Sequence, residues 1–237
     1  MAVSNTQIVF DNLYGIFTDL AIIVGIIVFA LMVYLIIRYR DKRSSQDPED
    51  TPRLGRIPLG RGHGRNVLTT VTLSTILLAV LIFTSFAAVD VLFPASEPPA
   101  TWCYGIPAYN QTQAAGQSCP RLEASGHQFY WTFNYPVPLA KPHPEVGIFR
   151  VPVNSTVVLD VTSTDVFHDF GIIEFKIKTD AIPGRTNTIW FVPYHNGTYT
   201  IQCFELCGTG HYYMTASLKV MPVADFLSWY HNATVTK

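Results

Sequence analysis

Two long apolar stretches occupy the first third of the 237-residue chain. The first covers residues 20–37 without a charged side chain, and the second covers 67–89 with only threonine and serine as polar members. About 18 or more apolar residues are needed for a helix to cross roughly 30 Å of hydrocarbon. Helices that pack on a soluble core normally keep a polar face, and these stretches have none. The pattern therefore predicts two membrane-spanning helices, at about 14–38 and 67–92.

The pattern changes to short runs of β-branched and aromatic residues from about residue 128 onward. Turn signals such as Pro183-Gly184 and Asn196-Gly197 separate these runs, as expected for a β-sandwich or barrel. The expected strands cover 128–135, 147–151, 155–162, 169–173, 188–192, 197–202 and 215–220. A short helix is expected at 224–230, and 101–120 resembles a surface loop. We therefore predict an N-terminal tail and a transmembrane helical hairpin over 1–95, and an external β domain over 96–237.

Basic residues predict how this hairpin is oriented. Residues 1–19 contain no lysine or arginine, whereas the connecting segment 38–65 contains eight. Loops rich in these residues stay on the cytoplasmic side, so the N-terminus and the β domain should both lie outside. The first apolar stretch lacks a basic n-region and a small-residue cleavage site, so we expect no removed signal peptide. Membrane lipid is therefore an expected partner, and the cell (plasma) membrane the expected location.

Composition and charge narrow the possible partners. Charged residues make up 14% of the chain, and the formal net charge is −1. Nucleic acid is therefore not an expected partner, because its binding proteins carry basic patches. Four Asn-x-Ser/Thr triplets begin at Asn110, Asn154, Asn196 and Asn232, all on the predicted outer side. Such triplets permit glycosylation but also occur by chance.

The four cysteines form two pairs with different predicted roles. Cys103 and Cys119 lie in the polar external loop, where oxidising conditions permit a disulfide. Cys203 and Cys207 share a twelve-residue loop with His211 and Met214. Thiolate and thioether are soft donors that suit reduced copper, and imidazole suits both copper oxidation states. This chemistry favours copper over zinc, for which a methionine ligand is unusual.

Three other interpretations of this loop stay open on spacing alone. The two thiols could form a disulfide, although four-residue spacing at the end of a strand gives poor geometry. They could hold zinc with His211 and a distant fourth ligand. A single-copper blue site needs one cysteine, so two thiolates fit a two-metal core better.

The loop resembles the copper-binding loop of the cytochrome c oxidase subunit II family, in which Cys-x-Glu-x-Cys precedes a histidine and a methionine. Here these positions are Cys203, Glu205, Cys207, His211 and Met214. The resemblance extends to Asp165-Val-Phe-His168, to the turn Lys178-Thr-Asp-Ala-Ile-Pro-Gly-Arg185, to Gly126-His-Gln-Phe-Tyr-Trp131 and to the two-helix anchor. It implies an all-β cupredoxin-like Greek-key sandwich behind a two-helix transmembrane hairpin.

The same resemblance implies a dinuclear copper centre known as CuA. Cys203 and Cys207 would bridge two copper ions, with His168 and Met214 completing one ion. His211 and the backbone carbonyl of Glu205 would complete the other. The Glu205 side chain would also reach a magnesium ion at the boundary with the catalytic subunit.

The family resemblance also implies an electron-transfer role, with no catalytic residue in this chain itself. Electrons would enter near Phe129, Tyr130 and Trp131 and pass to haem in subunit I, where oxygen is reduced to water by a proton-translocating oxidase. Most family members have tryptophan where this chain has Phe129, so the donor is either a cytochrome c or a blue copper protein. The alternatives are the electron-input subunit of a haem–copper nitric oxide reductase and a domain that only assembles a membrane complex.

Overall fold

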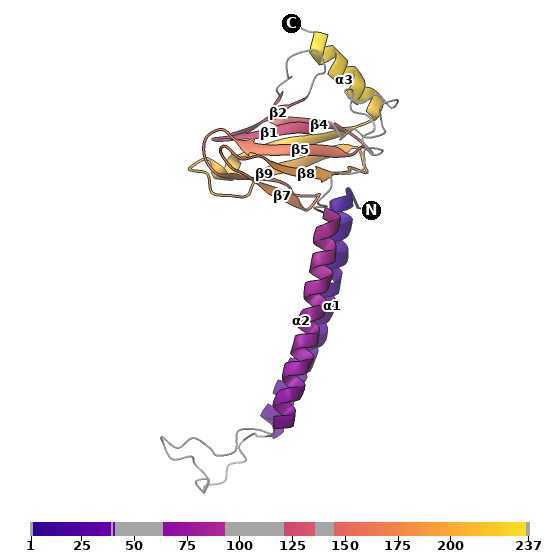
Figure 1. The fold of residues 1–237 in the computed structure, drawn as a ribbon, viewed down its shortest axis with the longest axis vertical. Coiled ribbons are helices and arrows are strands. Elements are labelled where there is room, and N and C mark those ends of the chain that lie inside the picture. Colours follow the sequence, from indigo (N-terminus) through magenta and orange to yellow (C-terminus); the bar gives the residue numbers. More distant parts are fainter. Residues whose placement is uncertain (1, 39, 41–63, 93–120, 136–144, 236–237) are drawn as a thin grey trace. The chain divides into compact units, whose positions relative to one another are not determined.

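The computed structural model describes residues 2–38, 40, 64–92, 121–135 and 145–235 (Figure 1). These residues form two compact units, one of 12–87 and one that combines 1–11 with 88–237. The first eleven residues thus belong with the β domain, whereas the sequence pattern had grouped them with the helical hairpin. Cys103, Cys119, Asn110 and most of the predicted cytoplasmic loop lie outside the described residues.

Two apolar helices are present, as the hydropathy predicted. Helix α1 covers Asn5–Arg38 and helix α2 covers Gly64–Leu92. Their most apolar 18-residue windows have mean hydropathies of 3.2 and 2.3. Helix α1 begins nine residues before the predicted start at residue 14, because the polar first turns continue the helix without a proline or glycine break. Both helices are long enough to cross a bilayer.

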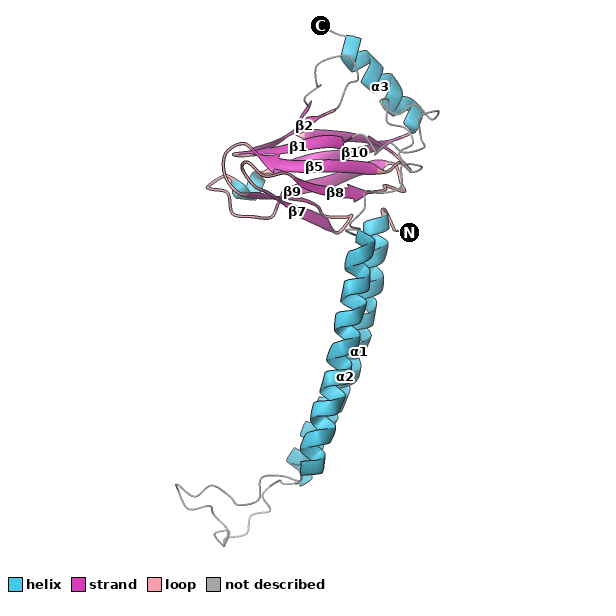
Figure 2. Ribbon diagram, viewed as in Figure 1, coloured by secondary structure: helices cyan, strands magenta, loops and turns pink. Residues whose placement is uncertain are grey.

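The β domain is a sandwich of two five-stranded sheets (Figures 1 and 2). The first sheet contains, in spatial order, β3 (Glu145–Val146), β2 (Tyr130–Asn134), β1 (Arg121–His127), β5 (Val157–Ser163) and β8 (Asn187–Phe191). The second contains β4 (Ile148–Pro152), β10 (Thr215–Met221), β9 (Gly197–Cys203), β6 (His168–Ile172) and β7 (Ile177–Ala181). A one-turn helix η3 (His211–Tyr213) precedes β10, and α3 (Val223–Val235) ends the domain. The predicted cupredoxin-like all-β sandwich is confirmed.

Three of these strands were not predicted, namely β1, the two-residue β3 and β7. Strand β1 contains charged and small residues, yet Leu122 and Ala124 alternate inward and are fully buried. The sequence pattern did not predict strand β7, because Lys178 and Asp180 interrupt its apolar residues. Strands β1 and β7 pair with predicted neighbours, β1 with β2 and β5, and β7 with β6. Pairing in a sheet therefore compensates for weak local propensity.

Aromatic side chains from both sheets fill the space between them. Phe133 and Phe149 stack with their ring centroids 4.7 Å apart, and both are fully buried. Trp131 meets Phe170 edge to face at 5.2 Å. Offset and edge-to-face aromatic pairs contribute about 0.5–1.5 kcal/mol beyond the burial of their area. This aromatic core fixes how the two sheets face each other at the end that carries the predicted ligands.

The N-terminal segment (residues 3–6) is an integral part of the β domain. The backbone of Asn5 donates to the carbonyl of Val192, and the Asn5 side-chain oxygen accepts from the Val192 N–H at 2.7 Å. Thr6 is 1% exposed, and its hydroxyl donates to the carbonyl of Phe175 at 2.6 Å. Ser4, also fully buried, forms an antiparallel bridge with Pro193. No periodic pattern predicts this contact, because it involves isolated polar residues.

We expect the Thr6→Val substitution to destabilise the β domain by about 1–3 kcal/mol, because the buried Phe175 carbonyl loses its main side-chain donor. Valine has the size of threonine, so the packing is otherwise kept. Denaturant unfolding of the full chain in detergent, followed by tryptophan fluorescence, measures the change. Thr179→Val is the control, because no side-chain hydrogen bond links the half-buried Thr179 to another described residue. Equal losses in both variants would contradict the role of the N-terminal segment.

Candidate metal centre

Strand pairing brings the predicted ligands together from two parts of the chain. Strands β6 and β9 are antiparallel neighbours, with Phe170 opposite Cys203. His168 lies two residues before Phe170 and therefore points to the same face of the sheet. The loop from β9 to β10 then returns past Cys207, turns through η3 at His211, and enters β10 after Met214. His168 is thus placed beside a loop that begins 35 residues later.

The donor atoms of this cluster lie close to one another. The two thiol sulfurs are 3.9 Å apart. The Cys203 sulfur lies 3.7 Å from His168 Nδ1 and 3.3 Å from the Glu205 carbonyl oxygen. The Cys207 sulfur lies 3.7 Å from both His211 Nδ1 and Met214 Sδ. All six predicted donor groups therefore converge, with the two sulfurs at the centre.

Most of the cluster is shielded from solvent. His168 and Met214 are 0% exposed, Cys203 is 1% exposed and Cys207 5% exposed. His211 is half-buried, and the Glu205 side chain is exposed, so only its backbone carbonyl belongs to the cluster. A buried group of histidine and cysteine side chains is typical of a metal site, because a metal ion supplies the partner that water cannot supply to the buried nitrogen and sulfur atoms.

The two thiols are not joined. Both cysteines are free, and 3.9 Å is far beyond the S–S bond length of about 2.05 Å. Burial, and then the neighbouring Cys203, raise the pKa of the Cys207 thiol to about 11. A metal ion must therefore displace this proton on binding, and uptake should release protons.

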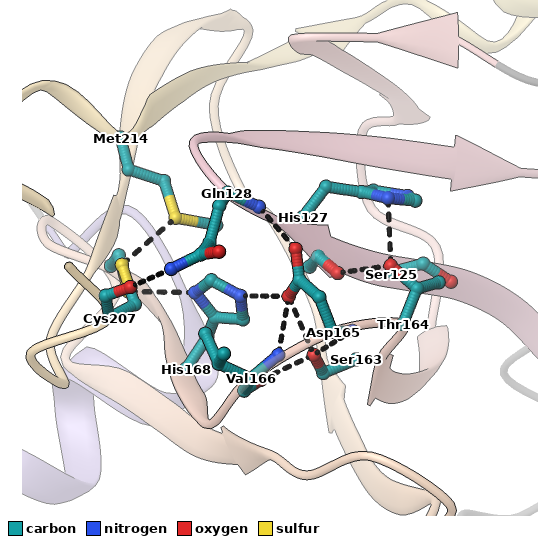
Figure 3. A network of polar contacts seen from close by, with 12 residues as sticks. Ser125, His127, Gln128, Ser163, Thr164, Asp165, Val166, His168, Cys207 and Met214 are labelled. Carbon is teal, nitrogen blue, oxygen red and sulfur yellow. Dashed lines mark hydrogen bonds and ion pairs between the residues drawn. The ribbon is translucent and has the colours of Figure 1, made fainter. Parts of the chain in front are cut away.

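Asp165 holds the histidine that comes from β6 (Figure 3). Its Oδ1 lies 2.9 Å from His168 Nε2, which leaves Nδ1 to face the sulfurs. Its Oδ2 accepts the backbone N–H of Gln128 at 2.7 Å. Partial burial opposes ionisation of this carboxyl group, but the bonds from His168, Gln128 and Val166 outweigh it and lower the pKa of Asp165 to about 2. An ionised Asp165 thus fixes the orientation and tautomer of the imidazole.

Close packing against glycines holds the cluster from two sides. A Cβ atom at Gly126 would lie 2.9 Å from the His168 ring and 3.1 Å from Trp131, so glycine is needed for this contact. Gly208 and Gly210 of the loop similarly leave room for the Phe129 ring. The Gln128 side-chain amide also donates to the Cys207 carbonyl. Segment 126–131 therefore forms one wall of the centre.

The predicted aromatic patch is divided by the fold. Trp131 is fully buried and meets the His168 ring edge to face at 5.9 Å. Phe129 is half-buried and meets Tyr213 at 5.8 Å, and Tyr130 is 43% exposed and stacks on His127. Phe129 and Tyr130 can thus contact another protein, whereas Trp131 supports a predicted ligand from inside.

Sequence reasoning missed two residues of this site. Asp165 and Gln128 both lie in segments that resemble the family, but neither was predicted to have a role of its own. A carboxylate three residues before a predicted histidine ligand was a usable signal, because metal-binding histidines commonly bond a carboxylate through their second nitrogen. Nothing in the sequence marked the contact of Gln128 with the loop.

Comparison with known proteins gives consistent similarities. Residues 147–221 match the family model described as cytochrome c oxidase subunit II, periplasmic domain. The chain is 28% identical to heme-copper oxidase subunit 2 of Aeropyrum pernix over 98% of this chain and 93% of that one. It is 30% identical to cytochrome c oxidase subunit 2 of Oenothera berteroana, over 52% of this chain and 57% of the relative, so only part of that relative is matched. The periplasmic domain of subunit II of cytochrome oxidase from Bradyrhizobium japonicum is 33% identical over 49% of this chain and 94% of that one, with a TM-score of 0.46.

We expect Asp165→Ala to lower the affinity of the cluster for copper by about 10- to 100-fold, because the His168 ring loses the acceptor that orients it. Competition with a chelator of known affinity measures the change. Asp160→Ala is the matched control. Asp160 on β5 forms an ion pair with Arg121 on β1, and among the described residues it forms no hydrogen bond with a member of the cluster. A copper affinity unchanged by Asp165→Ala would show that the carboxylate does not position His168.

Proposed function

Because the chain belongs to the cytochrome c oxidase subunit II family, we propose that it is the electron-transfer subunit of a haem–copper terminal oxidase, with a two-copper centre in its β domain. The observation that carries this proposal is the convergence of six donors around two buried sulfurs.

The spacing of the donors fits metal ions of the size of copper. Sulfur and nitrogen ligands lie about 2.0–2.3 Å from an ion such as zinc, so two ligands of one tetrahedral ion are separated by about 3.3–3.8 Å. The separations in this cluster run from 3.3 to 3.9 Å. The donor separations are therefore close to those expected between ligands of a metal ion.

The number of donors favours two ions over one. A single tetrahedral ion uses four donors, which would leave two of the six without a role. If both thiolates are shared, six groups complete two four-coordinate ions. His168 and Met214 would complete one ion, and His211 with the Glu205 carbonyl the other. The Glu205 side chain, which is exposed, would be free to reach magnesium at the boundary with the catalytic subunit.

The donor chemistry supports electron transfer. When bound, the copper ions supply a one-electron acceptor, and soft sulfur with imidazole ligands suits both oxidation states. The residues of this chain keep that site rigid and dry. Asp165 orients His168, Trp131 and Gly126 confine its ring, and the buried Met214 closes the cluster from the side of β10. Rigid ligands limit the rearrangement that accompanies a change of charge.

The electron donor is proposed to dock over Phe129 and Tyr130. Phe129 joins the surface to the ligand loop, since it packs on Gly208 and Gly210 while part of its ring stays exposed. The donor would be a cytochrome c or a blue copper protein, and the acceptor a haem in the partner subunit I, which reduces oxygen to water.

The outward placement of the β domain at the cell membrane is proposed on two grounds. The basic segment 38–65 favours a cytoplasmic loop. The N-terminal segment is bonded into the β domain, so the residues at the start of α1 belong with that domain. A chain with two spans returns to the side on which it began, in agreement with this arrangement.

Metal analysis of the full chain purified in detergent tests the centre. We expect two copper ions per chain and an electron paramagnetic resonance spectrum in which one unpaired electron is shared by two copper nuclei. Cys207→Ser should hold at most one copper and lose the shared signal, because one bridging thiolate is gone. A wild-type chain that binds a single copper, or prefers zinc, would refute the centre.

We expect Phe129→Ala to slow reduction of the copper centre by the donor protein by about 5- to 30-fold, because truncating an aromatic anchor at an interface costs about 1–2 kcal/mol. Stopped-flow absorbance follows the reduction. Tyr194→Ala is the control, since Tyr194 is also an exposed aromatic but follows the far end of β8. Reduction by a small inorganic reductant should be unchanged in both variants. A normal rate with the protein donor in Phe129→Ala would place electron entry elsewhere.

A further inference from the structure

Asn-x-Ser/Thr triplets are concentrated in the β domain, which is proposed to lie outside. Four of the six asparagines from residue 96 onward begin such a triplet, and none of the three before it does. Serine and threonine make up 35 of the 237 residues, so chance predicts about one triplet among six asparagines. The number of triplets therefore exceeds the chance value, and two of them, at Asn154 and Asn196, lie in the described residues.

Both asparagines lie exposed in turns at the same end of the sandwich. Asn154 stands between β4 and β5, and Asn196 stands between β8 and β9. The two turns are adjacent, because the Asn154 N–H donates to the Pro193 carbonyl at 2.7 Å. Turn geometry explains the asparagines themselves. Asn154 has a φ of 55°, and Asn196 precedes Gly197 at the start of β9.

Turn geometry does not explain the hydroxyl residue two positions later. Thr156 is 0% exposed, and its hydroxyl oxygen is buried without a hydrogen-bond partner among the described residues. A buried, unpaired hydroxyl lowers stability, and valine would fill the same space without this cost. Thr198 is exposed, and no side-chain hydrogen bond to another described residue accounts for it. Folding therefore gives no reason for the Thr156 hydroxyl, whereas a glycosylation triplet requires it.

We propose that Asn154 and Asn196 carry N-linked oligosaccharides. In the transfer, the side-chain nitrogen of asparagine bonds to the anomeric carbon of a saccharide carried on a membrane isoprenoid phosphate. The bond from that carbon to the phosphate oxygen breaks, the isoprenoid phosphate leaves, and the amide loses a proton. Because the Thr156 hydroxyl is buried in the folded domain, Asn154 is modified before folding is complete. Asn196 and Thr198 remain accessible afterwards.

The position of the two turns keeps saccharide away from the candidate metal centre. Strands β5 and β9 each contain seven residues and run from these turns toward the ligands. At about 3.3 Å per residue, each strand separates its turn from the metal centre by about 20 Å. Saccharide on this end therefore leaves the surface around Phe129 open to a donor.

Glycopeptide mass spectrometry of the full chain from its native membranes tests the proposal. We expect the peptides that contain Asn154 and Asn196 to carry added saccharide mass. Thr156→Val should abolish the modification of Asn154 while leaving the folded domain at least as stable, and Thr156→Ser should retain it. Asn196→Gln should remove saccharide from the second peptide, and Asn187→Gln, which lies outside any triplet, should leave both peptides unchanged.

An unmodified Asn196 in the wild-type chain overturns the proposal. An unmodified Asn154 beside a modified Asn196 overturns the explanation of the Thr156 hydroxyl. The inference rests on the outward placement of the β domain, which protease accessibility in intact cells tests separately. A domain that is accessible outside but bare refutes only the glycosylation, and neither outcome bears on copper content.

Discussion

The register between β6 and β9 is the constraint on which the candidate metal centre depends. Phe170 lies opposite Cys203, which places His168 and the first thiol at the same end and on the same face of the sheet. A slip of one residue would turn His168 to the opposite face, because side chains alternate along a strand. The buried aromatic residues around Phe170 prevent such a slip, since it would expose them to water. The chemistry of the site is therefore secured by the packing of the sandwich.

The surroundings of the cluster support the proposed role as an electron carrier. Sulfur and imidazole donors lie at ligand-to-ligand distances, and a network from Asp165 through His168 to Cys203 limits their movement. Segment 126–131 covers the cluster, with Trp131 supporting His168 from inside and Phe129 reaching the surface. One short segment thus combines support of a predicted ligand with the proposed contact for the donor. Phe129 forms the surface end of this segment, and Trp131 forms its buried end.

The two ends of the sandwich have different properties. One end carries the donor groups, with exposed aromatic residues such as Tyr212 and Tyr213 around them. The opposite end carries the N-terminal segment and the turns at Asn154 and Asn196, which are linked through Val192, Pro193 and Tyr194. This division follows from the strand order, since β5 and β9 connect the two ends directly. Changes in the turns at the far end can therefore leave the candidate metal centre undisturbed.

Sequence alone determined the features that depend on local pattern. Length and hydropathy predicted both apolar helices, alternation predicted most strands, and donor chemistry with the family resemblance singled out Cys203, Cys207, His211, Met214, His168 and Glu205. Only the tertiary structure decided how distant groups meet. It brought Asp165 onto His168 and Gln128 onto the ligand loop, buried Trp131, and bonded Thr6 to Phe175 across 169 residues of sequence. The physical reason is that each of these contacts joins single polar or aromatic residues that are distant in sequence. Such single residues form no periodic pattern, and only the pairing of the strands brings them together.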